Sequence, residues 1–281
     1  MIIRCWGARG SIPVSGATYD RYGGDTTCLE IRNADDEILI VDGGSGIRRL
    51  GNGLVRQGRL ACTMLFTHVH WDHMLGVPFF KPVYMPQASI RVLGCPVKQG
   101  SMEKHLAEAM KRPYFPIPFH QLASGITFDN ACSLDEPFSF GPMAISSIPL
   151  SHPNVGLGYR FEENGKRFVL LTDNELEHRH RGGATFEDYA AFAAGADVLF
   201  HDAEYTGDEY KITKTWGHST YTRALELAME AGVARFGLFH HNQDRGDDAL
   251  DAMVDHCRAI VAARGVRMEC FAVSQDTEII L

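Results

Sequence analysis

The stretch His68-Val69-His70-Trp71-Asp72-His73 follows the apolar run Met64-Leu65-Phe66, so we expect it at the end of a buried strand. In an extended or tightly turned segment, His68 and His70 can face the same way, while Asp72 and His73 begin a helix. The motif therefore brings four potential metal ligands together. Imidazole nitrogens suit zinc, iron or manganese, and a carboxylate adds the negative charge that holds a second cation nearby.

One short motif cannot fill two coordination shells, and three later residues are placed to complete them. Each follows an apolar, strand-like run that ends directly before it or a residue or two earlier; they are His152, Asp173 and His240. Any one of them alone could equally be a capping aspartate or a hydrogen-bonded histidine. Together with the first motif, chance is a poor explanation for the set.

Strands and helices are predicted to alternate along both halves of the chain. The apolar runs predict strands at 28–32, 38–41, 64–67, 90–93, 143–148, 158–162, 168–172, 198–201 and 236–239. Helical patterns occur at 45–57, 74–79, 102–111, 185–194, 219–231 and 249–263, with Ser219 as the expected N-cap of 219–231. Residues 81–142 are rich in proline, and we expect an insertion or lid there whose aromatic run 112–119 could line a substrate pocket.

The composition is that of a globular protein with one large domain spanning residues 1–281. Hydrophobic residues make up 45% of the chain, and 27 Lys+Arg against 35 Asp+Glu give a formal net charge of −8. This charge disfavours long nucleic acids and anionic membranes as partners. The seven cysteines are scattered without a C-x-x-C pair, and we see neither a leader nor a membrane-spanning run. We therefore expect reduced thiols and a cytoplasmic location.

The complete set of candidate ligands resembles the metallo-β-lactamase fold superfamily along nearly the whole chain. The resemblance implies an α/β fold, a four-layer αββα sandwich with two divalent metal ions, zinc by default and manganese or iron as alternatives. It assigns the ligands as follows: His68, His70 and His152 to one metal, Asp72, His73 and His240 to the other, and Asp173 to both. His241 competes with His240 for the last position, and Asp42 in the segment 38–44 would orient ligands from behind.

Two further segments indicate the branch of this superfamily. Phe200-His201-Asp202-Ala203-Glu204-Tyr205 and Gly217-His218-Ser219-Thr220 resemble the ribonuclease Z and phosphodiesterase branch. The resemblance implies that Asp202 supports His218, which contacts the scissile phosphate and assists the leaving oxygen. A carboxylate-held imidazole has a fixed tautomer and a raised proton affinity, as that role requires. For His201 we expect a structural role.

The N-terminal segments 6–13 and 22–28 also resemble bacterial members of this group, although Asp25 stands where Asn is usual. Arg9 could approach a phosphate or could equally be a structural arginine. The transfer-RNA enzymes of the branch insert a basic arm between the third-His and bridging-Asp motifs, and only twenty positions separate His152 from Asp173 here. The resemblance therefore favours a nucleotide or another small phosphodiester, hydrolysed by a metal-bridging hydroxide that Asp72 could orient. Related enzymes often form homodimers.

Three alternatives remain open. The same metals could activate an ester, lactone or thioester. A di-iron oxidoreductase of this fold typically carries a carboxylate where His70 stands, so this histidine argues for hydrolysis. A non-catalytic metal-binding module would be expected to have lost ligands, whereas all seven candidate positions carry chemically competent residues.

Overall fold

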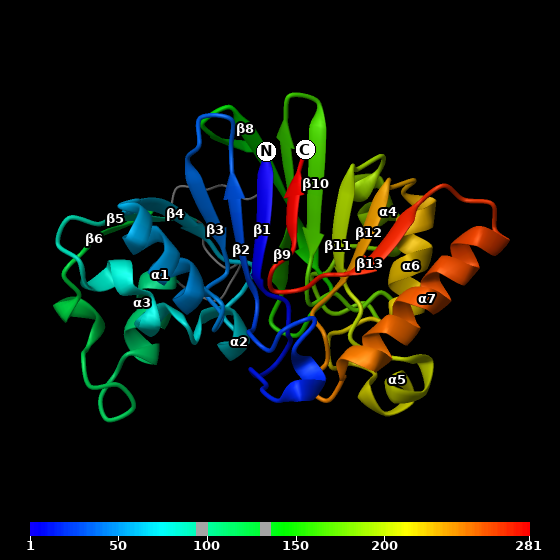
Figure 1. Ribbon diagram of the computed structural model, residues 1–281, viewed down its shortest axis with the longest axis horizontal. Helices are drawn as coiled ribbons and strands as arrows, with labels where there is room; N and C mark the ends of the chain where they lie inside the picture. The colour runs from blue at the N-terminus through cyan, green and yellow to red at the C-terminus, as the bar shows by residue number, and fades with distance from the viewer. Residues whose placement is uncertain (94–100, 130–135) are drawn as a thin grey trace.

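Two mixed β-sheets face each other in the computed structural model, which describes residues 1–93, 101–129 and 136–281 (Figure 1). The order of the first sheet is β14-β1-β2-β3-β4-β5-β6, and that of the second is β13-β12-β11-β10-β9-β8-β7. The strands of the first sheet are β1 (Ile2–Gly7), β2 (Cys28–Arg32), β3 (Ile38–Val41), β4 (Ala61–Leu65), β5 (Ser89–Leu93), β6 (Gly125–Asp129) and β14 (Glu278–Ile280). Those of the second are β7 (Phe138–Phe140), β8 (Met143–Leu150), β9 (Gly156–Glu163), β10 (Lys166–Leu171), β11 (Val198–Asp202), β12 (Arg235–Phe239) and β13 (Glu269–Ala272).

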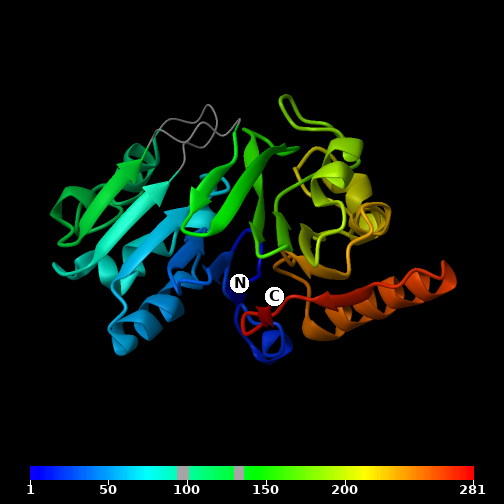
Figure 2. The ribbon, with the colours of Figure 1, turned by 90° about the horizontal axis from the view of Figure 1, so that it is seen from above.

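Helices cover the outer face of each sheet. In Figure 1, α1 and α3 lie outside the first sheet and α4, α6 and α7 outside the second, and Figure 2 shows the same two groups of helices from above. The α-helices are α1 (Ile47–Gln57), α2 (Trp71–Met74), α3 (Met102–Ala109), α4 (Phe186–Ala193), α5 (Gly207–Thr213), α6 (Tyr221–Glu230) and α7 (Asp247–Ala263). Short 3₁₀ turns are η1 (Ala17–Tyr19), η2 (Val77–Phe79), η3 (Lys81–Tyr84) and η4 (Phe119–Gln121). The expected αββα sandwich is confirmed.

The period-2 alternation of side chains along each central strand builds the layers. In β10, Phe168 and Leu170 pack between the sheets, whereas Val169 and Leu171 pack under the helices of the second sheet. Both faces of such a strand are buried, which explains why its sequence is continuously apolar rather than alternating. Phe168 meets Phe200 of β11 edge to face, with ring centroids 5.0 Å apart. β10 and β11 pair in parallel through their backbones, and this aromatic contact adds side-chain packing between the two strands.

Several boundaries differ from the sequence predictions. The expected helix 74–79 is instead the short helix α2 followed by the 3₁₀ turn η2, because Gly76 and Pro78 interrupt the pattern. The N-cap of α6 is Thr220, whose hydroxyl accepts a hydrogen bond from the Arg223 backbone N–H. The Ser219 hydroxyl donates to the Asn174 carbonyl instead, so Ser219 stabilises the loop that follows β10.

Residues 81–142 contribute to the sheet as well as to surface structure. β5 and β6 pair in parallel at one edge of the first sheet, so this part of the expected insertion is a regular extension of it. The Phe115 ring contacts Phe79 edge to face at 5.8 Å, which links the aromatic run to η2, close after the metal motif. Cys95 and Cys132 lie outside the described residues, and the other five cysteines are buried free thiols. Of the helices described, none has the length and apolar character needed to span a membrane.

Candidate metal centre

The candidate ligands lie where strands of both sheets end. Asp42 follows β3, His68 follows β4, and Asp173 and His240 follow β10 and β12. Asp42, Asp173 and His240 have left-handed backbones with φ of 63°, 47° and 55°. Such conformations cost non-glycine residues roughly 1–3 kcal/mol each and persist only where the surroundings impose them. Each strand therefore turns sharply at its end and directs the following polar side chain toward the same region.

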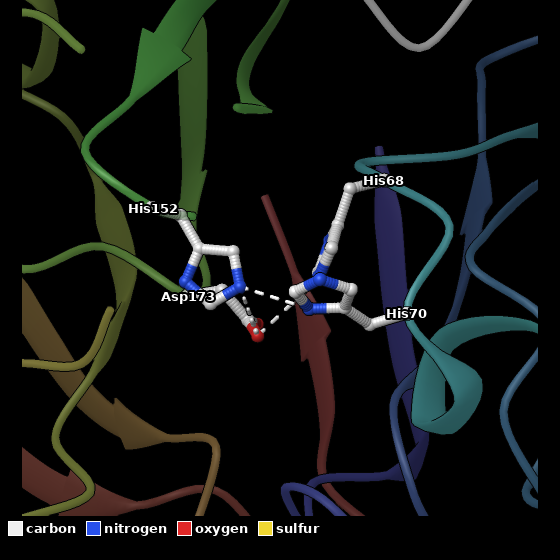
Figure 3. Close-up of side chains that lie close together, drawn as sticks. All are labelled: His68, His70, His152 and Asp173. Atoms are coloured by element: carbon white, nitrogen blue, oxygen red, sulfur yellow. Dashed lines mark hydrogen bonds and ion pairs between the residues drawn. The ribbon is translucent and has the colours of Figure 1, made fainter. Parts of the chain in front are cut away.

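Two overlapping groups of potential metal ligands contain the seven candidate residues, and a third group of Asp202, His218 and His240 adjoins them. His68, His70, His152 and Asp173 make the first group (Figure 3), and Asp72, His73, Asp173 and His240 make the second. Within each group, one potential ligand atom per residue lies within 4.8 Å of all the others. In Figure 3, His68 and His70 approach from the first sheet, while His152 and Asp173 approach from the second. All seven residues expected from the sequence are thus brought together.

Asp173 lies between the two groups. Its Oδ2 is 3.5 Å from His68 Nε2 and 3.7 Å from His152 Nε2. Its Oδ1 is 3.1 Å from His73 Nε2 and 3.3 Å from His240 Nε2. One carboxylate oxygen therefore faces each group, which is the arrangement that a bridging ligand requires.

The donor atoms fit a metal better than they fit one another. Among the described residues, the buried Nε2 atoms of His68 and His73 make no hydrogen bond of good geometry, although Asp173 oxygens lie 3.5 and 3.1 Å from them. Buried polar atoms are normally satisfied, so each such atom calls for a ligand. The Nδ1 atoms are engaged: that of His68 lies 3.0 Å from Thr67 Oγ1, and that of His73 lies 2.8 Å from Asp42 Oδ2. This leaves the Nε2 lone pairs directed at the centre.

Asp42 lies behind the candidate ligands and contacts His73. Its carboxylate is fully buried and accepts hydrogen bonds from the Thr67 backbone N–H and hydroxyl, both at 2.8 Å, besides its contact with His73. Metal-ligating histidines commonly donate their other ring N–H to such a carboxylate, which fixes the tautomer and the ring orientation. Burial raises the pKa of Asp42, although His73 and Thr67 oppose this shift.

The electrostatics of the two groups differ. Burial lowers the pKa of His68 well below its usual value and that of His152 to about 3, which favours the neutral rings that bind a metal. Burial also opposes the charged form of His73, but the carboxylates of Asp173, Asp72 and Asp42 raise its pKa well above the usual value. This concentration of negative charge attracts a proton in the metal-free chain, and it would attract a divalent cation in the same way.

A histidine–carboxylate pair, His218 and Asp202, adjoins the ligand groups. His218 Nδ1 lies 2.7 Å from Asp202 Oδ2, and its ring stacks on that of His240 with centroids 4.8 Å apart. Burial opposes its charged form, but Glu204 and Asp202 raise the pKa of His218 to about 9. The contact between Asp202 and His218 that the sequence predicted is therefore present, directly beside the candidate ligands.

Glu204 is the residue of the centre that sequence analysis missed. Its Oε2 lies 2.9 Å from His240 Nδ1 and 3.4 Å from His218 Nδ1, while Oε1 accepts a hydrogen bond from Asn242 Nδ2. Glu204 thus contacts the Nδ1 atom of His240 in the same way that Asp42 contacts the Nδ1 atom of His73. Glu204 lies two residues after Asp202, just beyond β11, so the alternation of side chains could have placed it on the same side as Asp202. This alternation does not reveal which histidine the Glu204 carboxylate contacts.

The structure also distinguishes among the remaining sequence candidates. His240, not His241, faces Asp173, because His241 Nε2 contacts the Val273 carbonyl at 2.7 Å. His201 is buried, with Nδ1 2.7 Å from the Asp202 carbonyl, in keeping with a structural role. Arg9 is fully buried and donates to the carbonyls of Gly23, Asn242 and Arg245, so it ties loops together rather than facing a phosphate.

The N-terminal loop closes one side of the centre. The Ser11 backbone N–H donates to Asp72 Oδ2 at 2.8 Å, and Gly10 lies against the ring of His240. A Cβ atom at residue 10 would be 2.3 Å from two atoms of that ring, so only glycine allows this approach. Asp25 accepts a hydrogen bond from the Ser45 hydroxyl at 2.7 Å, outside both ligand groups.

Comparison with known proteins identifies the family. The model of the family described as "Beta-lactamase superfamily domain" matches residues 48–241, more than half of the chain, and the chain belongs to this family. A curated relative, Ribonuclease Z of Porphyromonas gingivalis, is 24% identical over 256 residues, covering 74% of this chain and 80% of its own.

Two solved structures share the fold. The metallo-beta-lactamase fold protein YhfI from Bacillus subtilis has a TM-score of 0.71 at 16% identity and covers 99% of this chain and 98% of its own. The short form of human tRNase Z has a TM-score of 0.67 at 17% identity, and the match covers 100% of this chain and 99% of the tRNase Z chain. With the family match and the curated relatives, these findings confirm the expected superfamily and its ribonuclease Z and phosphodiesterase branch. They support a metal-dependent phosphoric diester hydrolase.

Replacing Asp42 should destabilise the fold even without metal. Asp42→Ala leaves the Thr67 donors and His73 without their buried partner, so we expect the free energy of unfolding to fall by about 3 kcal/mol. Urea unfolding in excess chelator measures this change without a contribution from bound metal. Asp255→Ala removes an exposed carboxylate of α7 and should change stability by at most about 0.5 kcal/mol. Equal stabilities of the two variants would contradict the role of Asp42.

Proposed function

We propose that the chain is a dinuclear metal-dependent phosphodiesterase acting on a nucleotide or another small phosphodiester. The observation that carries the proposal is the position of Asp173, whose two oxygens face separate groups of histidines. His68, His70 and His152 would hold one divalent cation, zinc by default and manganese or iron as alternatives, and Asp72, His73 and His240 would hold the other. When bound, such a pair supplies positive charge that polarises a phosphoryl oxygen and makes a water molecule more acidic.

The side chains around the two groups divide into those that orient ligands and those that face the substrate. Asp42 and Glu204 engage the Nδ1 atoms of His73 and His240, so these rings stay oriented whether or not a substrate is present. Asp72 is itself a candidate ligand, and its Oδ2 lies 3.1 Å from His240 Nε2. This position is compatible with orienting the attacking water as well.

We assign proton transfer to the leaving oxygen to His218. Asp202 engages Nδ1, which leaves Nε2 as the nitrogen available to a substrate, and two neighbouring carboxylates favour the protonated ring. The departing alkoxide would take that proton, so the ring loses one positive charge as the P–O bond breaks. Asp202 then holds the neutral ring in the tautomer that can be protonated again at Nε2.

A small substrate is favoured by the short connection between His152 and Asp173. The described residues between them form β9 and β10, which pair as a hairpin closed at Asn164 and Gly165. This hairpin leaves no room for a basic arm, and the net charge of −8 provides no general attraction for a polyanion.

A ribonucleic acid is the second candidate substrate, because the curated relatives are named Ribonuclease Z. A panel of cyclic nucleotides, linear dinucleotides, bis(p-nitrophenyl) phosphate, a carboxylic ester and a precursor transfer RNA would discriminate the candidates. We expect turnover of the small phosphodiesters, with the RNA and the ester left intact under the same conditions. Cleavage of the RNA with no turnover of small diesters would contradict the preference, and preferred cleavage of the ester would contradict the phosphodiesterase assignment itself.

Loss of His218 should impair chemistry without removing metal. We expect His218→Ala to lower kcat on a linear dinucleotide, whose leaving oxygen is an alkoxide, by about 100-fold, the scale of general acid catalysis, while metal content per chain stays at the wild-type level. The loss on bis(p-nitrophenyl) phosphate should be much smaller, because p-nitrophenolate leaves without a proton. Metal analysis by plasma mass spectrometry and steady-state kinetics on the same preparation measure both. His256→Ala, which removes an exposed histidine of α7, should leave both values unchanged. Wild-type activity of His218→Ala on the dinucleotide would overturn the assignment.

A further inference from the structure

An exposed tryptophan sits on a strained loop beside the candidate metal centre. Trp216 is 61% exposed and lies two residues before His218. The residue before it, Thr215, has a φ of 75°, a left-handed conformation that is unfavourable for a β-branched side chain. Exposing a large apolar ring forgoes the stabilisation that its burial would give, so packing within the chain does not account for the position of the Trp216 ring.

A buried carboxylate holds this loop in place. Glu175 is 1% exposed, and its Oε1 accepts hydrogen bonds from the Thr215 backbone N–H at 2.7 Å and the Tyr210 hydroxyl at 2.6 Å. Its Oε2 accepts from the Gly217 N–H at 2.9 Å and lies 2.7 Å from His180 Nε2. The backbone on both sides of Trp216 is therefore fixed by one anchor, and the ring is presented from a rigid loop.

The loop also contacts the first group of ligands. The Gly217 carbonyl lies 2.9 Å from His152 Nδ1, and His152 Nε2 lies 3.0 Å from His70 Nδ1. On the far side of this chain of contacts, Trp71 directly follows His70 and is 67% exposed. Trp216 and Trp71 therefore each lie next in sequence to a residue that contacts His152. Trp71 belongs to the first half of the chain and Trp216 to the second.

We propose that Trp216 contacts the substrate and stacks on a nucleobase, so that the substrate is a nucleotide phosphodiester. This inference rests on the proposed phosphodiesterase function and specifies its substrate class. A flat ring that remains largely open to water suits a nucleobase, because the base covers the ring with its face and keeps its polar edges solvated. An aliphatic group at the same place would stay largely hydrated and gain little. The anchored loop reduces the entropy lost when the base binds.

Two esters with the same leaving group test the inference. Thymidine 5′-(p-nitrophenyl phosphate) carries a base and methyl p-nitrophenyl phosphate does not, and both release p-nitrophenolate from a phosphodiester. Stacking on an aromatic side chain corresponds to about 1–3 kcal/mol per base, so Trp216→Ala should lower the ratio of kcat/KM for the nucleoside ester over the methyl ester by about tenfold, mainly through KM. Trp216→Phe should retain most of the ratio. Ile212→Ala, which removes an 81% exposed side chain of α5, should leave it unchanged.

The outcomes separate this inference from the proposed function. An unchanged ratio in Trp216→Ala would overturn the inference, and loss of a dimer in the ultracentrifuge together with an unchanged ratio would assign Trp216 to a contact between copies of the chain. If the wild type hydrolyses neither ester, the proposed function fails. Calorimetric binding of thymidine 5′-monophosphate then decides the inference: about tenfold weaker binding by Trp216→Ala supports it, and equal or absent binding contradicts it.

Discussion

The arrangement of the centre depends on one carboxylate placed among four imidazoles. Asp173 is 2% exposed and brings a negative charge within 3.7 Å of ring nitrogens from both sheets. Without a cation, the Nε2 atoms of His68 and His73 approach Asp173 but make no hydrogen bond of good geometry among the described residues, and buried polar atoms left in this state are costly. The fold therefore brings together a cluster of ligand atoms that divalent cations would satisfy.

The carboxylates that surround the candidate ligands make the same kind of contact with histidines. Three histidines, His73, His240 and His218, each direct Nδ1 at a buried carboxylate, which is Asp42, Glu204 or Asp202 respectively. These acids follow or end β3 of the first sheet and β11 of the second, so the ends of the strands supply the orienting groups as well as ligands. In the function that we propose, the same contact orients a ligand in the first two pairs and a proton donor in the third.

Much of the fold and the centre could be predicted from sequence, for identifiable reasons. Central strands such as β3 and β10 are buried on both faces, so their continuous apolar runs were visible, and each ended near a polar residue that proved to face the centre. Strands β1, β6, β7, β13 and β14 were not predicted. β7 and β14 are only three residues long, and all five carry half-buried or exposed side chains that blur the apolar pattern.

The residues that escaped prediction act across long stretches of sequence. Glu204 meets a histidine 36 positions away, and Glu175 meets Gly217 at a distance of 42 positions. No local pattern marks such contacts, because they depend on how the strand ends of one sheet are placed beside each other. His68 to His73, in contrast, form a local motif whose spacing carries most of its own information.

The claim that Asp173 joins two metal sites is tested most directly by counting bound metal. Plasma mass spectrometry of the wild type and of Asp173→Ala, each saturated with zinc and freed of loosely bound ions, gives the number of ions per chain. The account predicts about two ions in the wild type and a clear loss in the variant, since both groups share the deleted carboxylate. A single ion in the wild type, or an unchanged count in Asp173→Ala, would contradict it.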